Sequence, residues 1–181
     1  MKKIIWYSFL FVLIISGLSC GSKQGNDSKS LSGKVVGVID GDTYDLLMDG
    51  NETIRIRMEG IDAPEKGMPF YKKAKKHLSD LCFGKIVRLD VKEKDRYGRK
   101  VAFSYLDDGT ELSHEMIKVG LAWHYKKYNN DPDLASLEMQ ARDSRRGIWV
   151  DESPMPPWEN RKYHRNGIST KDSFDINLGQ D

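Results

Sequence analysis

The stretch Arg57-Met58-Glu59-Gly60-Ile61-Asp62-Ala63-Pro64-Glu65 decides how this chain is organised. It continues an alternation in which Ile54, Ile56 and Met58 are apolar and the residues between them are charged, which predicts a β-strand with one buried face. Pro64 then ends the strand, because proline has no backbone N–H for the sheet. A strand followed by a forced turn brings one guanidinium and two carboxylates together. That grouping suits a hard metal ion and a phosphodiester.

Charged residues at the end of a strand are also common on ordinary solvated surfaces, so other stretches must support a site. Asp40-Gly41-Asp42-Thr43 lies between two predicted strands, where Asp-Gly is a strong hairpin signal. The turn does not require its second aspartate, so Asp42 is a candidate metal ligand. Asp62 is its candidate partner, because neighbouring strands lie about 5 Å apart. Two carboxylates without thiol or paired imidazole favour a hard cation such as calcium.

The third stretch is Asp95-Arg96-Tyr97-Gly98-Arg99. One interpretation is simply the charged tip of a hairpin. The other is contact with nucleic acid, because two arginines flank an aromatic residue and a glycine. Arg99 could hold a phosphate with its planar fork, and Tyr97 could stack on a base.

Alternating and helical periodicities predict five short strands and three amphipathic helices. The strands are expected at Lys34–Ile39, Tyr44–Met48, Thr53–Gly60, Lys85–Glu93 and Lys100–Leu106. The helices carry apolar residues at helical spacing around Tyr71–Leu81 and Leu112–Val119, and after the cap and first turn Asp131-Pro132. One helix falls between the third and fourth strands. This order predicts an α+β fold, a small five-stranded Greek-key β-barrel of the OB type.

The N-terminus predicts export. Lys2 and Lys3 precede an apolar run, Ile4–Ile15, and small residues follow it, so residues 1–19 are expected to be a signal peptide. The run is short for a membrane span, which needs about 20 residues, although a retained span is an alternative. Gly17-Leu18-Ser19-Cys20-Gly21 resembles a bacterial lipobox, with Leu displaced by one place. We therefore expect lipidation at Cys20 and a lipoprotein facing the periplasm or cell exterior. Cleavage without lipidation, giving a secreted protein, stays open.

Composition divides the rest of the chain. Residues 20–32 are polar and are expected to form a flexible tether, with the folded domain at 33–150. Residues 151–181 are expected to be an extended strap with several prolines, anchored by Trp158, followed by a disordered tail from 166.

Net charge and cysteine content exclude several classes of function. The chain has 29 Lys+Arg and 27 Asp+Glu, and loss of residues 1–19 removes two lysines, so the mature form is formally neutral. Any attraction for nucleic acid must therefore be local. Cys82 is the one cysteine besides Cys20, so a mature lipoprotein has no internal disulfide, and a buried apolar role is expected for it. The four histidines lack the spacing of a zinc site.

Together the three stretches resemble the staphylococcal-nuclease-like, or thermonuclease, family over about residues 33–149, in the same order and spacing. Carried over position by position, the resemblance implies that Asp42 and Asp62 hold calcium and that Ala63 adds a backbone carbonyl. The same comparison implies that Asp40 lies close to the metal. The remaining roles that it implies are phosphate binding by Arg57 and Arg99, activation of water by Glu65, and substrate contacts by Arg96, Tyr97, Tyr125 and Tyr128.

The resemblance implies a calcium-dependent phosphodiesterase, an endonuclease or exonuclease, that cleaves DNA and RNA with little sequence preference and leaves 3′-phosphate ends. We expect it to act as a monomer. Two rival interpretations are a non-catalytic OB-fold lipoprotein that binds nucleic acid or protein, and a surface lipoprotein with an adhesive or structural role. Neither of these functions would require three carboxylates and two arginines at these spacings.

Overall fold

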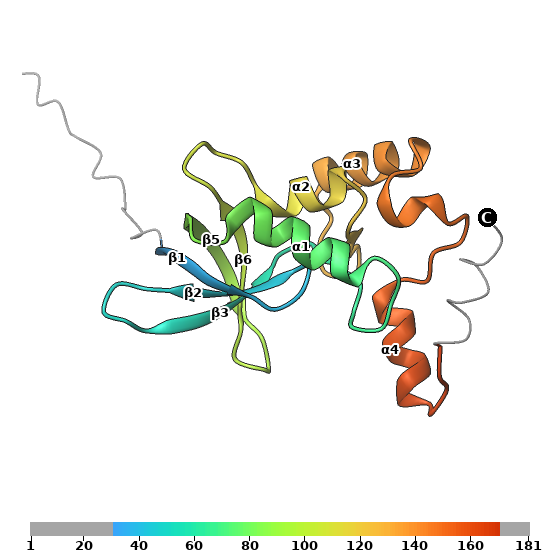
Figure 1. The fold of residues 1–181 in the computed structure, drawn as a ribbon, viewed down its shortest axis with the longest axis horizontal. Coiled ribbons are helices and arrows are strands. Elements are labelled where there is room, and N and C mark those ends of the chain that lie inside the picture. The colour runs from blue at the N-terminus through green and yellow to red at the C-terminus, as the bar shows by residue number, and fades with distance from the viewer. Residues whose placement is uncertain (1–30, 171–181) are drawn as a thin grey trace, which may run out of the picture.

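The computed structural model describes residues 31–170 (Figure 1). The strands are β1 Leu31–Val38, β2 Thr43–Leu47, β3 Thr53–Met58, β4 Ile61–Asp62, β5 Ile86–Lys94, β6 Lys100–Tyr105 and β7 Trp123–His124. The helices are α1 Tyr71–Cys82, α2 Leu112–Lys118, α3 Pro132–Asp143, the 3-10 helix η1 Gly147–Val150, and α4 Pro157–Arg165. In this part of the chain, no helix is long and apolar enough to cross a membrane.

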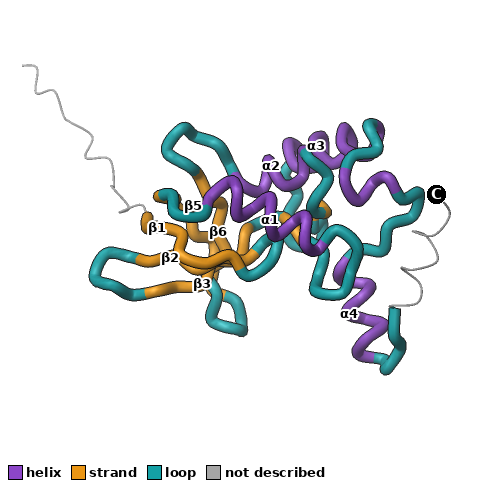
Figure 2. Tube along the Cα trace, in the orientation of Figure 1, coloured by secondary structure: helices purple, strands orange, loops and turns teal. Residues whose placement is uncertain are grey.

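Five of the strands form a closed barrel in the order β1-β2-β3-β6-β5. The first three are an antiparallel meander, β3 then pairs in parallel with β6, and β1 pairs with β5 to close the barrel. The helices gather beside the barrel, with α2 and α3 together and α4 well separated from them (Figures 1 and 2). This mixed barrel with four α-helices confirms the predicted α+β, OB-like class.

The alternation that predicted β3 also explains its packing. Ile56 and Met58 are buried in the core, whereas Arg55 and Arg57 point to the other side of the strand. Each fully buried apolar side chain of this size contributes about 1.5–3 kcal/mol to folding. The barrel core also contains Tyr44, whose hydroxyl donates to Ser104 Oγ at 2.8 Å, so its buried polar atom is satisfied.

The predicted third strand, Thr53–Gly60, is too long. The strand β3 ends at Met58, because Gly60 has φ +76° and turns the chain away from the barrel. The next two residues form β4, which pairs with β7 through Ile61↔His124 and Asp62↔Trp123. Asp62 therefore lies on a separate two-stranded ribbon rather than on a barrel strand.

The prediction of an extended strap after Asp151 is wrong over its middle part. Residues 157–165 form α4, which begins with Pro157 at a position where a helix needs no N–H donor. The anchor predicted at Trp158 is confirmed, because its ring stacks on Tyr125 with centroids 5.1 Å apart. The predicted disordered tail also starts too early. The structure describes residues 166–170, and Thr170 is buried.

At the other end, β1 already begins at Leu31, which pairs with Leu89, so the last two residues of the predicted tether belong to the barrel. The predicted signal peptide and the predicted lipidation site Cys20 lie outside the described residues. Cys82 is buried, as predicted, and its thiol donates to the carbonyl of Leu78. The predicted cap Asp131 accepts a bond from Asp133 N at 2.8 Å at the start of α3.

Candidate active site

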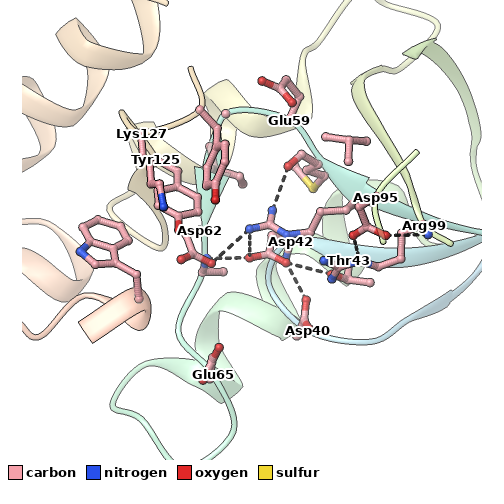
Figure 3. A pocket seen from close by; sticks show the side chains of 18 of the residues that line it. Asp40, Asp42, Thr43, Glu59, Asp62, Glu65, Asp95, Arg99, Tyr125 and Lys127 are labelled. Carbon is pink, nitrogen blue, oxygen red and sulfur yellow. Dashed lines mark hydrogen bonds and ion pairs between the residues drawn. The ribbon is translucent and has the colours of Figure 1, made fainter. Parts of the chain in front are cut away.

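Two buried carboxylates and one guanidinium form the centre of the site. Arg57 Nη2 lies 3.1 Å from Asp62 Oδ1 and 3.4 Å from Asp42 Oδ2, so one cationic group reaches both acids. Asp42 is 6% exposed and Asp62 is 2% exposed. Arg57 Nη1 donates to the carbonyl of Met58 at 2.8 Å, which fixes the guanidinium. The two aspartates predicted as partners therefore face each other across Arg57 (Figure 3).

Close packing of the Asp40–Thr43 turn sets the position of Asp42. A Cβ at Gly41 would lie 2.7 Å from Ala63 Cβ and 2.8 Å from Ala74 Cβ, so this turn fits against α1 only with glycine. Asp42 Oδ2 accepts from the amide of Ala63 at 2.7 Å, and its Oδ1 accepts from Thr43 Oγ1 at 2.9 Å. The amide of Ala63 thus links the turn to β4. Its carbonyl as a metal ligand stays a prediction.

Asp40 lies next to Asp42, one of the two candidate metal ligands. Its Oδ1 accepts from the amide of Asp42 at 3.1 Å. Burial, together with the negative charge of Asp42, raises the pKa of Asp40 to about 7. Burial also raises the pKa of Asp62, and a hydrogen bond from Arg161 opposes that shift. Both carboxyl groups therefore bind a proton more readily than they would in water unless a cation lies beside them.

Glu65 lies on the loop after β4 and is held by an arginine that the sequence analysis did not select. Arg161, on α4, places Nη1 2.6 Å from Glu65 Oε1 and Nη2 2.6 Å from Asp62 Oδ2. Burial lowers the pKa of Arg161, but its bonds to Asp62 and Glu65 outweigh that effect and raise it, so the guanidinium stays charged. The sequence signal was the Pro-Pro pair before a run with basic residues in its last turn, the pattern of a helix.

The third predicted stretch forms another part of the same pocket. Arg99 Nε donates to Asp95 Oδ2 at 2.7 Å, on the side of the site away from Asp62 (Figure 3). Partial burial favours the neutral form of Asp95, but the bonds from Arg99 outweigh it and lower the pKa of Asp95. Tyr97 is 71% exposed, and the guanidiniums of Arg96 and Arg99 lie 5.1 and 5.6 Å from its ring centroid. These side chains line the same pocket as Asp42 and Asp62. Over the described part of the chain, their hydrogen bonds and ion pairs are with one another rather than with those two acids.

The two predicted base-stacking tyrosines have different surroundings. Tyr125 is stacked on Trp158, with the rings 3° from parallel, so one face of its ring is covered. Tyr128 packs edge-on against Tyr125, with centroids 4.9 Å apart, and is 66% exposed. Tyr128 is therefore the more available surface for a base. Both tyrosines, with Trp158, line the pocket that contains Asp42 and Asp62.

The donor atoms fit a hard cation. Within residues 31–170, no group of three or more His, Cys, Asp or Glu side chains is arranged to hold a metal. The candidate side-chain donors are the two carboxylates Asp42 and Asp62, which share the guanidinium of Arg57. Calcium takes about six to eight oxygens and accepts carbonyls and waters among them, so two carboxylates are a reasonable start for such a site.

The match to a family of known proteins agrees with this geometry. The model of the staphylococcal nuclease homologues matches residues 55–151. An uncharacterized endonuclease of Haemophilus influenzae is 40% identical over 164 residues, covering 91% of this chain and 88% of its own. A micrococcal nuclease of Shigella flexneri is 37% identical over 147 residues, covering 76% of this chain and 84% of its own. The barrel, the paired aspartates and these similarities show that this chain belongs to the staphylococcal nuclease family.

Proposed function

We propose that this protein is a calcium-dependent phosphodiesterase that hydrolyses DNA and RNA with little sequence preference and leaves 3′-phosphate ends. Family membership supports the nuclease function. The observation that carries the proposal is the convergence of Asp42, Asp62 and Arg57 in one pocket with Glu65 and Arg99. A non-catalytic nucleic-acid-binding domain does not require these acids to be buried around a shared cation.

The residues divide the work of phosphodiester hydrolysis. Asp42 and Asp62, with the carbonyl of Ala63, would hold calcium, which when bound supplies a Lewis acid that neutralises a phosphate oxygen. Arg57 is fixed by Met58 and stabilises negative charge that grows on the phosphate. Arg99 does the same from the opposite side of the pocket. Glu65 orients the attacking water and accepts its proton.

Aromatic and basic side chains beyond the centre would bind the substrate. Tyr128 offers an exposed ring for stacking on a base, and Tyr97 does so beside Arg96. Such contacts read the face of a base rather than its edge, so they give little sequence preference and serve DNA and RNA alike. We also propose that the protein acts as a monomer, because the candidate site residues of one chain line a single pocket.

Removal of calcium is expected to abolish cleavage, since two carboxylates of the site would then lack their dication. Full-length protein in EDTA should show no cleavage of single-stranded DNA or of RNA, and added calcium should restore cleavage of both. The measurement is a calcium titration with the two substrates side by side, with product ends identified by labelling before and after phosphatase. Full activity in chelator would contradict the metal site, and binding without cleavage at any calcium concentration would favour the non-catalytic alternative.

We also propose that the protein is an exported lipoprotein, on the strength of residues 1–21 of the sequence. Cells fed a palmitate analogue should label the wild-type protein, and the Cys20→Ser variant should carry no label, because the acylated thiol is gone. Equal labelling of both proteins would rule out Cys20 as the anchor. A shortened but unlabelled wild-type protein would indicate secretion after cleavage.

A further inference from the structure

The helix α4 contributes three basic residues, Arg161, Lys162 and Arg165, to the lining of the pocket, and Arg161 is the one that is bonded to the acids Asp62 and Glu65. Arg161 extends from the middle of α4 to Asp62 and Glu65, nearly a hundred residues earlier in the chain. The match to the family model ends at residue 151, before α4 begins.

The position of α4 is well determined by packing. A nine-residue helix is marginal by itself, so tertiary contacts must hold it. Trp158 stacks on Tyr125, Pro157 and Asn160 are buried, and Asn160 accepts a bond from Thr170 Oγ1 after the helix. These contacts hold the backbone of α4 in place, so the position of Arg161 relative to the site is well defined.

The contacts of Arg161 are unequal in their importance to the two acids. Asp62 has a second cationic partner in Arg57, whereas the Glu65 carboxylate, among the described residues, is bonded to Arg161 alone. Glu65 lies on a loop, so without this bond its carboxylate can sample several rotamers. Because Arg161 also occupies Asp62 Oδ2 at 2.6 Å, it competes with any metal ion for that oxygen.

We propose that Arg161 is a positioning residue that holds Glu65 for the reaction and, through Asp62, lowers the affinity of the site for calcium. This inference rests on the proposed function. Loss of Arg161 is expected to raise calcium affinity and to lower turnover. General damage to the fold would lower both. Removing Arg161 should strengthen calcium binding, because a positive charge beside the ligand is lost, and should slow turnover, because Glu65 loses its orientation.

The test uses the full-length Arg161→Gln variant, with Lys118→Gln as the control. Lys118 forms an exposed ion pair with Glu115 on α2 and does not line the pocket. Calorimetric titration with calcium should show binding about tenfold tighter in Arg161→Gln, which corresponds to about 1.4 kcal/mol. Turnover at saturating calcium should fall about 10–100-fold, as expected when a catalytic group is misplaced. Lys118→Gln should change both quantities by less than about twofold.

A double-mutant cycle separates action through Glu65 from other effects. In the Glu65→Gln background, adding Arg161→Gln should lower turnover by less than about threefold, because the group that Arg161 positions is already absent. Arg161→Lys keeps the charge without the planar fork, so it should bind calcium like wild type yet turn over more slowly. It also keeps the test available if Arg161→Gln does not fold, as judged by thermal unfolding.

Calcium binding that is unchanged or weaker in Arg161→Gln, or a turnover loss that persists in full in the Glu65→Gln background, would overturn the inference. Equal effects in Lys118→Gln would do the same, because they would indicate a general effect of losing one positive charge. Failure of the proposed function would give a different result. A wild-type protein without nuclease activity would refute that function, while the calcium titration would still report on the contact between Arg161 and Asp62.

Discussion

Replacing Arg99 with alanine is expected to lower turnover by about 10³-fold while leaving the fold nearly as stable as wild type. Removing one preorganised hydrogen-bond donor that stabilises the transition state lowers the rate by about 10²–10³-fold. Removing a guanidinium takes away a positive charge as well as two parallel hydrogen bonds. Stability should change little, because Arg99 is partly exposed on a hairpin and its one ion pair is with Asp95. Single-turnover cleavage of an oligonucleotide at saturating calcium, with urea unfolding of the same sample, measures both quantities.

Arg145→Ala is the control for Arg99. Arg145 also pairs with a nearby acid, Glu152, at 3.8 Å, but its side chain is 64% exposed and it does not line the pocket. The variant should lose less than about 0.5 kcal/mol of stability and keep its turnover. Turnover of Arg99→Ala near that of Arg145→Ala would remove Arg99 from the site. Arg99→Lys should fall between the two, because an ammonium ion keeps the charge but cannot bind a phosphate with two parallel bonds.

Replacing Glu65 with glutamine is expected to lower turnover by about 10³-fold with little change in calcium affinity. Glutamine keeps the shape of the side chain and can still meet Arg161, but it cannot accept the proton of the attacking water, and general-base catalysis contributes about 10²–10⁴. Rates should be measured under single-turnover conditions, so that product release does not mask the chemical step. Calcium affinity, measured by calorimetry, shows whether the loss lies in metal binding instead.

Glu59→Gln is the control for that experiment. Glu59 lines the same pocket, and its Oε1 accepts from Asn129 Nδ2 at 3.0 Å, a bond that glutamine can also accept. Its turnover should stay within about threefold of wild type. If Glu65→Gln behaved like Glu59→Gln, water would have to be activated by another group, and the role assigned to Glu65 would be wrong.

The sequence by itself determined the barrel and the central acids. The alternation Ile54, Ile56, Met58 defines a strand with one buried face, and its length and turns belong to a small barrel. Asp42 is a candidate because its turn does not require a second aspartate, and Asp62 is its candidate partner because neighbouring strands of a meander lie close together. Such features depend on local geometry, which a periodic pattern and a glycine or proline specify.

Only the tertiary structure decided where Asp62 and Arg161 lie. Gly60 turns the chain out of β3, and pairing of β4 with β7 then places Asp62 on a separate ribbon. The helix α4 is short and begins among prolines, so its local pattern resembled an extended strap. Stacking of Trp158 on Tyr125 and the ion pairs of Arg161 stabilise it at the site. These contacts join residues far apart in the chain, so a local sequence pattern cannot predict them.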